Sequence, residues 1–507
     1  MSIFVILGIL IVLCLIIGVG ILSGRKVKNS SDFLTGGGQA SPLLVAGSIL
    51  GSLVSSQATI GTAQLAFHYG LAAWWFTLGS GIGCLVLALA YTRGLRQSGC
   101  ITELQIISKE YGSSVSSIGS ILCSIGIFIS VLAQVVACVG LVSVLFPKIP
   151  TPLAAIVSIL AMCIYVIFGG AWGAGMGGVI KLLLLCATAI LGIVFVMVTC
   201  SGISGITNLL SDLFLKTDLG SIQTAANNLK TLSSEADIAN RFANLIARGA
   251  MKDIGSGLSL LLGVLSTQTY AQAIWSGKTD AAAKRGALLS ACLIPPIGIG
   301  GICIGLFMRT HYILQAEVDT LVSLGLQIPN LPVLENTIQV FPAFVLNHLP
   351  ALVSGIILGT LLFSVVGGGA GLSLGMATII LKDVLKKVCK KIETPRQELL
   401  VVRVVIAGIL VIAAIITIFV SSSTINDLGF LSMGLRGSVV FLPLLCALWF
   451  PGKIDIRGVF ASMILSPCAI FIAKLLSLPI DSLFVGIGVS ALCCITGVAL
   501  KRSHSAN

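Results

Sequence analysis

The strongest constraint in this sequence is a series of apolar runs of about 20 residues that recurs from one end of the chain to the other. A run of that length crosses the roughly 30 Å hydrocarbon core of a bilayer as an α-helix. With 56% hydrophobic and only 9% charged residues, the chain cannot be a soluble globular protein. We therefore predict an all-α membrane protein of about 13 transmembrane helices, near residues 2–22, 42–69, 72–92, 116–145, 152–171, 175–200, 253–275, 286–307, 349–381, 399–420, 426–449, 457–475 and 480–499.

The positive charge of the chain lies mostly in short loops between these runs. The formal net charge is +12, and basic clusters such as "GRKVK" and "KDVLKKVCKKIETPR" fall on one side of the predicted membrane. Cytoplasmic loops carry this excess of Lys and Arg, so no nucleic acid is needed as a partner. We predict a multi-pass protein of the plasma membrane, with its N-terminus outside and its C-terminus in the cytoplasm.

The order of the spans predicts an inverted repeat. Five spans starting at residue 42 begin inside and five starting at residue 253 begin outside, as in many secondary transporters. The predicted segments are an N-terminal helix and cytoplasmic linker at 1–41, a first repeat at 42–200, an external loop at 201–252, a second repeat at 253–450 that contains an external loop at 308–347, and two C-terminal helices with a tail at 451–507.

The first span of each predicted repeat is unusually polar. These spans read "PLLVAGSILGSLVSSQATIGTAQLAFHYG" and "DIGSGLSLLLGVLSTQTYAQAIW". Interrupted helices at mid-membrane bind solutes and ions through unwound backbone, and glutamine has no low-energy place in lipid. Packing of small residues between helices is the alternative explanation. The solute-binding candidates on these spans are Ser52, Ser55, Ser56, Gln57, Ser256 and Gln268.

Several stretches resemble, in order, the sodium:solute symporter family, which contains the bacterial proline and galactose symporters. They are "DFLTGGGQASPLLVAGSILGS", "SSQATIGTAQLAFHYGLAAWW", "ITELQIISKEYG", "YVIFGGAWGAGMGGVIK", "TQTYAQAIWSGKTDAAAKRGAL" and "SSSTINDLGFLSMGLRGSVVFLPLLCALWFP". The resemblance covers roughly residues 30 to 460. It implies the leucine-transporter fold, an inverted repeat of 5+5 helices, together with alternating access and symport of sodium.

The resemblance also implies a sodium site, from which this sequence departs. In the family, sodium binds carbonyl oxygens of the unwound first core helix and two adjacent Ser/Thr hydroxyls of the eighth. Alignment without gaps puts Gly51 and Val54 on carbonyl positions of the first core helix, and Ser364 on a carbonyl position of the eighth. Gly367 and Gly368 stand at the hydroxyl positions, so both hydroxyl ligands are missing.

A second departure concerns an aspartate that relatives carry near their sodium. Its position here is Gly178, and Lys181 follows one helical turn later. We hypothesise that the lysine ammonium replaces sodium, as in some sodium-independent carriers of this fold, and that the glycines make room for it. Coupling would then use protons or no ion. The alternatives are a snorkelling lysine, a glycine run that only packs helices, and a shifted sodium site that uses Ser364 and Ser373.

Arg436 is the other charge predicted within the membrane. Such a cation must face a cavity, backbone carbonyls or a ligand. We expect it to clamp carbonyls of a broken helix, with attraction of an anionic solute as the alternative. No acid stands at a similar depth in the sequence, since the 18 Asp and Glu lie in loops, tails or span ends, with Asp253 and Asp427 nearest the membrane.

These features predict a secondary active transporter that moves a small organic solute. The stretch "SGLSLLLGVL" offers few hydrogen-bonding groups, so an organic acid or amino acid is favoured over a sugar. The resemblance implies Na⁺ as the coupling ion and H⁺ is the substitute; we predict no other cofactor, no securely bound metal, and a monomeric carrier in the lipid bilayer. The chain has no P-loop and no HExxH motif, which argues against an enzyme. A transporter-like sensor or receptor without transport is the alternative function.

Overall fold

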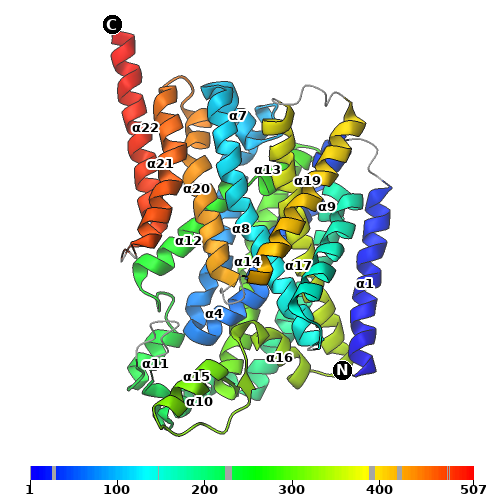
Figure 1. Ribbon diagram of the computed structural model, residues 1–507, viewed down its shortest axis with the longest axis vertical. Coiled ribbons are helices and arrows are strands. Elements are labelled where there is room, and N and C mark those ends of the chain that lie inside the picture. The colour runs from blue at the N-terminus through cyan, green and yellow to red at the C-terminus, as the bar shows by residue number, and fades with distance from the viewer. Residues whose placement is uncertain are drawn as a thin grey trace.

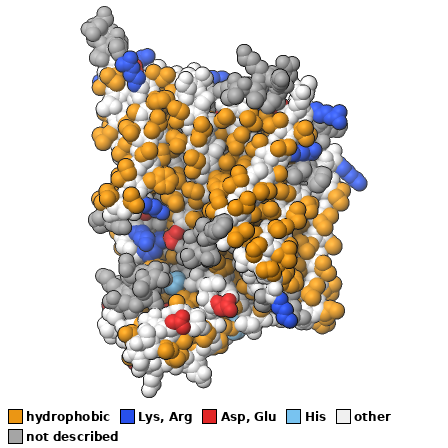
Figure 2. All heavy atoms as spheres, in the orientation of Figure 1, with side chains coloured by type: hydrophobic (Ala, Val, Ile, Leu, Met, Phe, Trp, Pro, Cys, Tyr) orange, Lys and Arg blue, Asp and Glu red, His pale blue; other side chains and the backbone are white. Residues whose placement is uncertain are grey.

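A computed structural model describes residues 2–25, 30–146, 148–222, 231–386, 394–419, 425–476, 478 and 480–506, and these residues are almost entirely helical (Figure 1). Ten helices in the described ranges are long and apolar enough to cross a membrane. The predicted count of 13 spans is not confirmed by this measure, because the helical segments Pro42–Leu53, Thr151–Val166 and Ala250–Leu265 are too short for it. Figure 2 shows apolar side chains covering the side of the helical body.

The first repeat begins after the peripheral helices α1 (Ile3–Gly24) and α2 (Ser30–Thr35) and the short turn η1 (Gly36–Gly38). Its first core helix is interrupted and its second contains a π-helical turn. The elements are α3 (Pro42–Leu53), η2 (Gln57–Gly61), α4 (Thr62–Tyr69), η3 (Gly70–Trp74), α5 (Trp75–Val86), η4 (Leu87–Tyr91), α6 (Thr92–Gln97), α7 (Glu103–Tyr111), α8 (Ser113–Leu145) and α9 (Thr151–Thr199).

The helix α9 contains two of the predicted spans in one element. The Tyr165 hydroxyl donates to the Gly173 carbonyl at 2.9 Å and lies against Gly177. A straight helix would separate residues 165 and 177 by about 18 Å along its axis. The two arms of α9, up to Val166 and from Ala171 on, therefore do not share one straight axis, and they serve as separate core helices.

The second repeat has the opposite direction. Its first core helix starts on the side of the molecule where α4 ends, and it is also interrupted (Figure 1). The elements are α12 (Ala250–Leu265), α13 (Gln268–Ser276), α14 (Asp280–His311), α17 (Ala351–Ile379), η7 (Ile380–Leu385), α19 (Pro395–Phe419) and α20 (Ile425–Trp449), followed by the peripheral pair α21 (Ile456–Leu475) and α22 (Ser482–Ala506).

Short helices cover the face that we predict to be external. They are α10 (Gly202–Leu215), η5 (Asp218–Gly220), α11 (Glu235–Phe242), α15 (Gln315–Ser323), η6 (Thr337–Gln339) and α16 (Val340–His348), together with the two-residue parallel strands β1 (Ile313–Leu314) and β2 (Val333–Leu334). Arg241 Nε donates to His68 O at 2.9 Å, and Trp75 Nε1 donates to Leu245 O at 2.6 Å. This layer is thereby fastened over the outer end of the first interrupted helix.

Candidate functional site

The interruption of the first core helix leaves a backbone carbonyl without its helical partner. Val54 leaves the helical conformation, with φ −85° and ψ 82°, directly after α3 ends. The Ser55 amide then bonds to Leu53 O at 3.1 Å rather than to Gly51 O four residues back. The Gly51 oxygen therefore points away from its own helix, in the way that unwound membrane helices present ligands.

Lys181 fills the position in front of this carbonyl. Its Nζ donates to Gly51 O at 2.7 Å and to Ser364 O at 3.0 Å. The side chain is 1% exposed, and within the described ranges no carboxylate forms an ion pair with it. The ammonium therefore joins three core elements, α3, α17 and the second arm of α9, through backbone oxygens alone. It does not snorkel to the membrane surface.

The neighbouring carbonyl of Val54 is also occupied by the protein. Ser364 Oγ donates to Val54 O at 3.2 Å, so the three oxygens that the alignment assigns to sodium contact lysine or serine. Within α17 the residues 367–371 remain helical. A Cβ on Gly368 would lie 2.5 Å from Ser55 Cβ, so this glycine is needed for close packing. A Cβ on Gly367 would have room, with Gly51 O at 3.9 Å as its nearest neighbour.

Gln134 of α8 anchors the two residues that follow the interruption. Its Nε2 donates to Ser55 Oγ at 2.8 Å, and its Oε1 accepts from Ser56 Oγ at 2.8 Å. The amide is fully buried. Both ends of the amide are satisfied by residues of the broken segment, so Gln134 fixes the path of the chain through the break.

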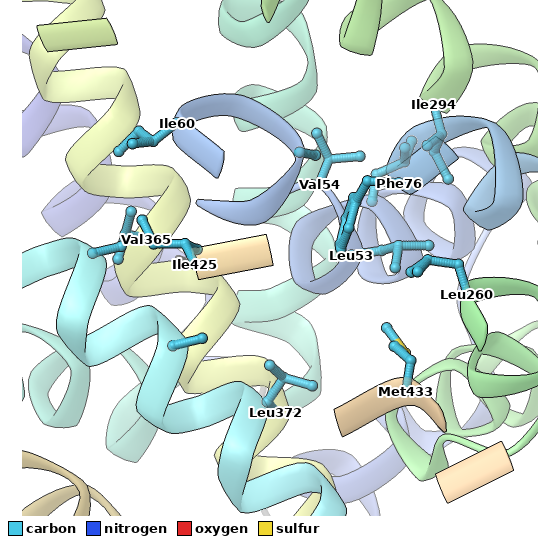
Figure 3. Close-up of a cluster of buried hydrophobic side chains, with 14 of the residues drawn as sticks. Leu53, Val54, Ile60, Phe76, Leu260, Ile294, Val365, Leu372, Ile425 and Met433 are labelled. Carbon is cyan, nitrogen blue, oxygen red and sulfur yellow. The ribbon is translucent and has the colours of Figure 1, made fainter. Parts of the chain in front are cut away.

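Unpartnered amides lie beyond the break. Gln57 Nε2 and both polar atoms of the Asn426 side chain are buried without a hydrogen-bond partner. Gln57 and Phe76 both lie against Gly429. Figure 3 shows Phe76 among apolar side chains of several helices, which include Leu53, Val54, Leu260 and Met433. A buried amide without a partner costs about 1–3 kcal/mol, which a bound solute can relieve.

Arg436 of α20 holds the interruption of the second broken helix. Its Nη1 donates to Thr267 Oγ1 at 2.8 Å, at the break between α12 and α13. Its Nη2 donates to Ser130 Oγ at 3.0 Å and to Ser432 Oγ at 2.9 Å, and its Nε to Ser432 O at 3.1 Å. The guanidinium is fully buried and engaged on all three nitrogens. These contacts match a structural clamp, although the groups held are mainly hydroxyls rather than the expected carbonyls.

Comparison with known sequences decides the family. Residues 33–466 match the profile of the Sodium:solute symporter family, which is far more than half of the chain. This chain belongs to the sodium:solute symporter family. The prediction from the sequence motifs is confirmed.

Relatives of this symporter-family chain are distant. The Uncharacterized symporter YwcA of Bacillus subtilis (strain 168) is 27% identical over 169 residues, which is 32% of this chain and 32% of that protein. A Na⁺-coupled sialic acid symporter in a substrate-bound, outward-open state aligns over 99% of this chain and 98% of its own, with 18% identity and a TM-score of 0.74. MHP1, a nucleobase-cation-symport-1 family transporter in a closed conformation, aligns over 94% and 96%, with 10% identity and a TM-score of 0.51. These structures confirm the leucine-transporter fold of 5+5 helices.

The sodium site implied by the symporter family does not fit the residues present. A hard cation such as sodium needs several oxygens directed at it. Here the Gly51 and Ser364 carbonyls accept from Lys181, and positions 367 and 368 carry no side chain. A Cβ on Gly178 would overlap Gly47 O, so the aspartate of relatives has no room at that position.

The predicted solute-binding residues of the two interrupted helices separate into four places. Ser55, Ser56 and Gln57 lie at the first break, whereas Ser52 Oγ is unpartnered beside a cavity of about 20 Å³ that Thr269 and Gln272 also line, room for one water. Ser256 contacts Arg248 at the end of α12. Gln268 donates to Ile101 O at 2.8 Å and accepts from the Glu103 amide at 3.2 Å. The structure therefore does not bring Ser256 and Gln268 together with the residues of the first break.

Four buried polar residues were not predicted from the sequence: Gln134 and Asn426 near the first break, and Glu103 and Asp383, which contact Gln268 and Thr102. Gln134 could have been found as the one amide in an apolar span. Glu103 and Asp383 appeared to be loop residues, yet they are only 2% and 1% exposed, because α7 packs beneath the core. Thr102 Oγ1 donates to Asp383 Oδ1 at 3.1 Å. Burial raises the pKa of Glu103 well above its ordinary value, and the charge of Arg436 opposes that shift.

Proposed function

We propose that this protein is a secondary active transporter that moves a small organic solute by alternating access and that does so without sodium. The observation that carries this proposal is the position of Lys181 Nζ, 2.7 Å from Gly51 O and 3.0 Å from Ser364 O. Alternating access in this fold requires the interrupted helix to move relative to its neighbours. The ammonium supplies, from within the chain, a positive charge that links the moving elements.

The residues around the break support a partly apolar solute. Leu53, Phe76 and Leu260 belong to the buried apolar core, and Gln57 Nε2 and the Asn426 amide are buried groups without a hydrogen-bond partner among the described residues. A sugar would need many more such groups. We therefore propose an amino acid or a short organic acid as the solute.

Arg436 does not contribute to this assignment. All three of its nitrogens bond to the protein, so the guanidinium is not available to a solute carboxylate. The preference for an amino acid or organic acid rests on the small number of hydrogen-bonding groups at the first break instead.

Counterflow in proteoliposomes tests the proposal. Vesicles preloaded with a mixture of unlabelled amino acids and short carboxylic acids are diluted into choline buffer that contains one labelled member at a time. We expect labelled solute to accumulate without sodium, and Gln57→Leu to abolish the accumulation. Exchange that appears only when sodium is added would refute the role of Lys181. Solute binding without any exchange would refute transport and favour a sensor.

A further inference from the structure

A large groove lies beside the peripheral helix α1, within the membrane-spanning part of the molecule. It has a volume of about 720 Å³ and is formed by α1, the first arm of α9, α17 and α19. Figure 1 shows α1 at the edge of the molecule, beside α9 and α17. Its floor is apolar, and a Cβ on Gly20 would meet nothing within 4 Å. Within a bilayer, such an apolar space holds acyl chains.

Two arginines give one end of this groove a positive charge. Arg25 caps the last turn of α1, and Arg403 stands about 12 Å along α19 from its first residue. Both side chains line the groove, whose described lining residues include no Asp or Glu. The nearby Glu398 is paired with Lys382 at 2.7 Å and also with Lys386.

One donor of the Arg403 guanidinium has no acceptor among the described residues. Its Nε is buried without a hydrogen-bond partner, and its Cζ lies 5.7 Å from the centre of the Phe33 ring, which fixes its direction. A phosphate oxygen would satisfy this donor and complement both arginines. We propose that the groove binds one anionic phospholipid of the leaflet that faces Arg25, with its phosphate between Arg25 and Arg403 and its acyl chains along α1 and α17. Basic pockets between transmembrane helices hold lipid headgroups in this way.

The position of the groove links this lipid to the ion site. Tyr165 and Val366 form its inner wall, and the Cβ position of Gly367 lies 4.0 Å from the Tyr165 ring and 3.9 Å from Gly51 O. One layer of side chains therefore separates the acyl chains from the carbonyl that Lys181 contacts. The lipid would brace α1 and α19 against that wall. This proposal depends on neither transport nor the role of the lysine.

Native mass spectrometry and thermal unfolding of the full-length protein test the proposal. The protein is purified in a neutral detergent and titrated with phosphatidylglycerol, phosphatidylcholine or soluble glycerol phosphate. We expect one phosphatidylglycerol to remain bound and to raise the melting temperature, whereas phosphatidylcholine and glycerol phosphate do neither. The double variant Arg25→Gln/Arg403→Gln should bind roughly thirtyfold more weakly.

Two further variants make the test decisive. Arg403→Lys keeps the charge and should retain most of the lipid affinity, which separates loss of binding from loss of folding. Arg457→Gln removes an exposed arginine at the start of α21, which does not line the groove, and should bind like the wild type. Equal retention of both lipids, or equal binding by the double variant and by Arg457→Gln, would overturn the proposal. An effect of glycerol phosphate equal to that of the lipid would assign the site to a soluble anion instead.

Discussion

Replacement of Lys181 by alanine is the perturbation that most directly probes the proposed mechanism. The Gly51 and Ser364 carbonyls would each lose a hydrogen bond from a charged donor, worth about 1.5–3 kcal/mol. Together these amount to about 3–6 kcal/mol, of which part is offset because a buried ammonium no longer has to be desolvated. We take about 3 kcal/mol as the net free energy lost by the arrangement in which Lys181 links α3, α9 and α17. Because 1.4 kcal/mol corresponds to a factor of ten, counterflow by Lys181→Ala should be about 100-fold slower.

The geometry also predicts which second substitution can create a sodium site. In Lys181→Ala/Gly367→Ser, the new hydroxyl enters the space that the lysine vacates, since a Cβ at position 367 has no neighbour closer than 3.9 Å. Sodium could then bind the two freed carbonyls and this hydroxyl. Lys181→Ala/Gly368→Ser is the matched control, because its Cβ would lie 2.5 Å from Ser55 Cβ. We expect only the first double variant to recover activity, and only with sodium present.

Initial rates of counterflow, measured in sodium and in choline buffers, provide the assay. The wild type should have the same rate in both buffers, and Lys181→Ala should be slow in both. The reasoning is wrong if Lys181→Ala keeps a rate within about threefold of the wild type, a difference of only about 0.7 kcal/mol. It is equally wrong if the two double variants respond to sodium in the same way.

Three more perturbations follow from the described contacts. Burial raises the pKa of Glu103 above its ordinary 4.5, and the charge of Arg436 opposes this shift. The folded protein therefore holds a proton that the unfolded chain releases, so thermal stability should fall as the pH rises from 4.5 through the raised pKa. Glu103→Gln should remove that fall. Gly178→Ala places a Cβ on a backbone oxygen and should lower stability by about 1–3 kcal/mol in a denaturation assay, whereas Gly408→Ala, with nothing within 4 Å, should not. Gln57→Leu removes a side-chain amide whose Nε2 has no hydrogen-bond partner, so the melting temperature of the variant should not fall, whereas solute binding should be lost. A lower melting temperature together with normal solute binding would contradict this assignment.

The sequence by itself determined the membrane class, the family and the two interrupted helices. Apolar runs of bilayer length allow only helices to satisfy the backbone, so composition and length were enough for the fold class. The interruptions were predictable because Gln57 and its neighbouring hydroxyls cannot lie in lipid. The division of α9 into two arms was also predictable, since the apolar runs place a span boundary near residue 171.

Only the tertiary structure decided which polar groups meet. Gly51 O is directed at Lys181 because α3 and α9 approach closely at Gly47 and Gly178, and no local pattern records that distance. Glu103 lies in a connecting segment by sequence, yet the packing of α7 beneath the core buries it. The sequence predicts that the buried charge of Arg436 needs hydrogen-bond partners. It does not identify them, because their hydroxyls come from α8 and from the break before α13. Hydropathy reports the mean environment of a segment, whereas a binding site depends on the directions of individual side chains, and these are fixed only when the helices pack.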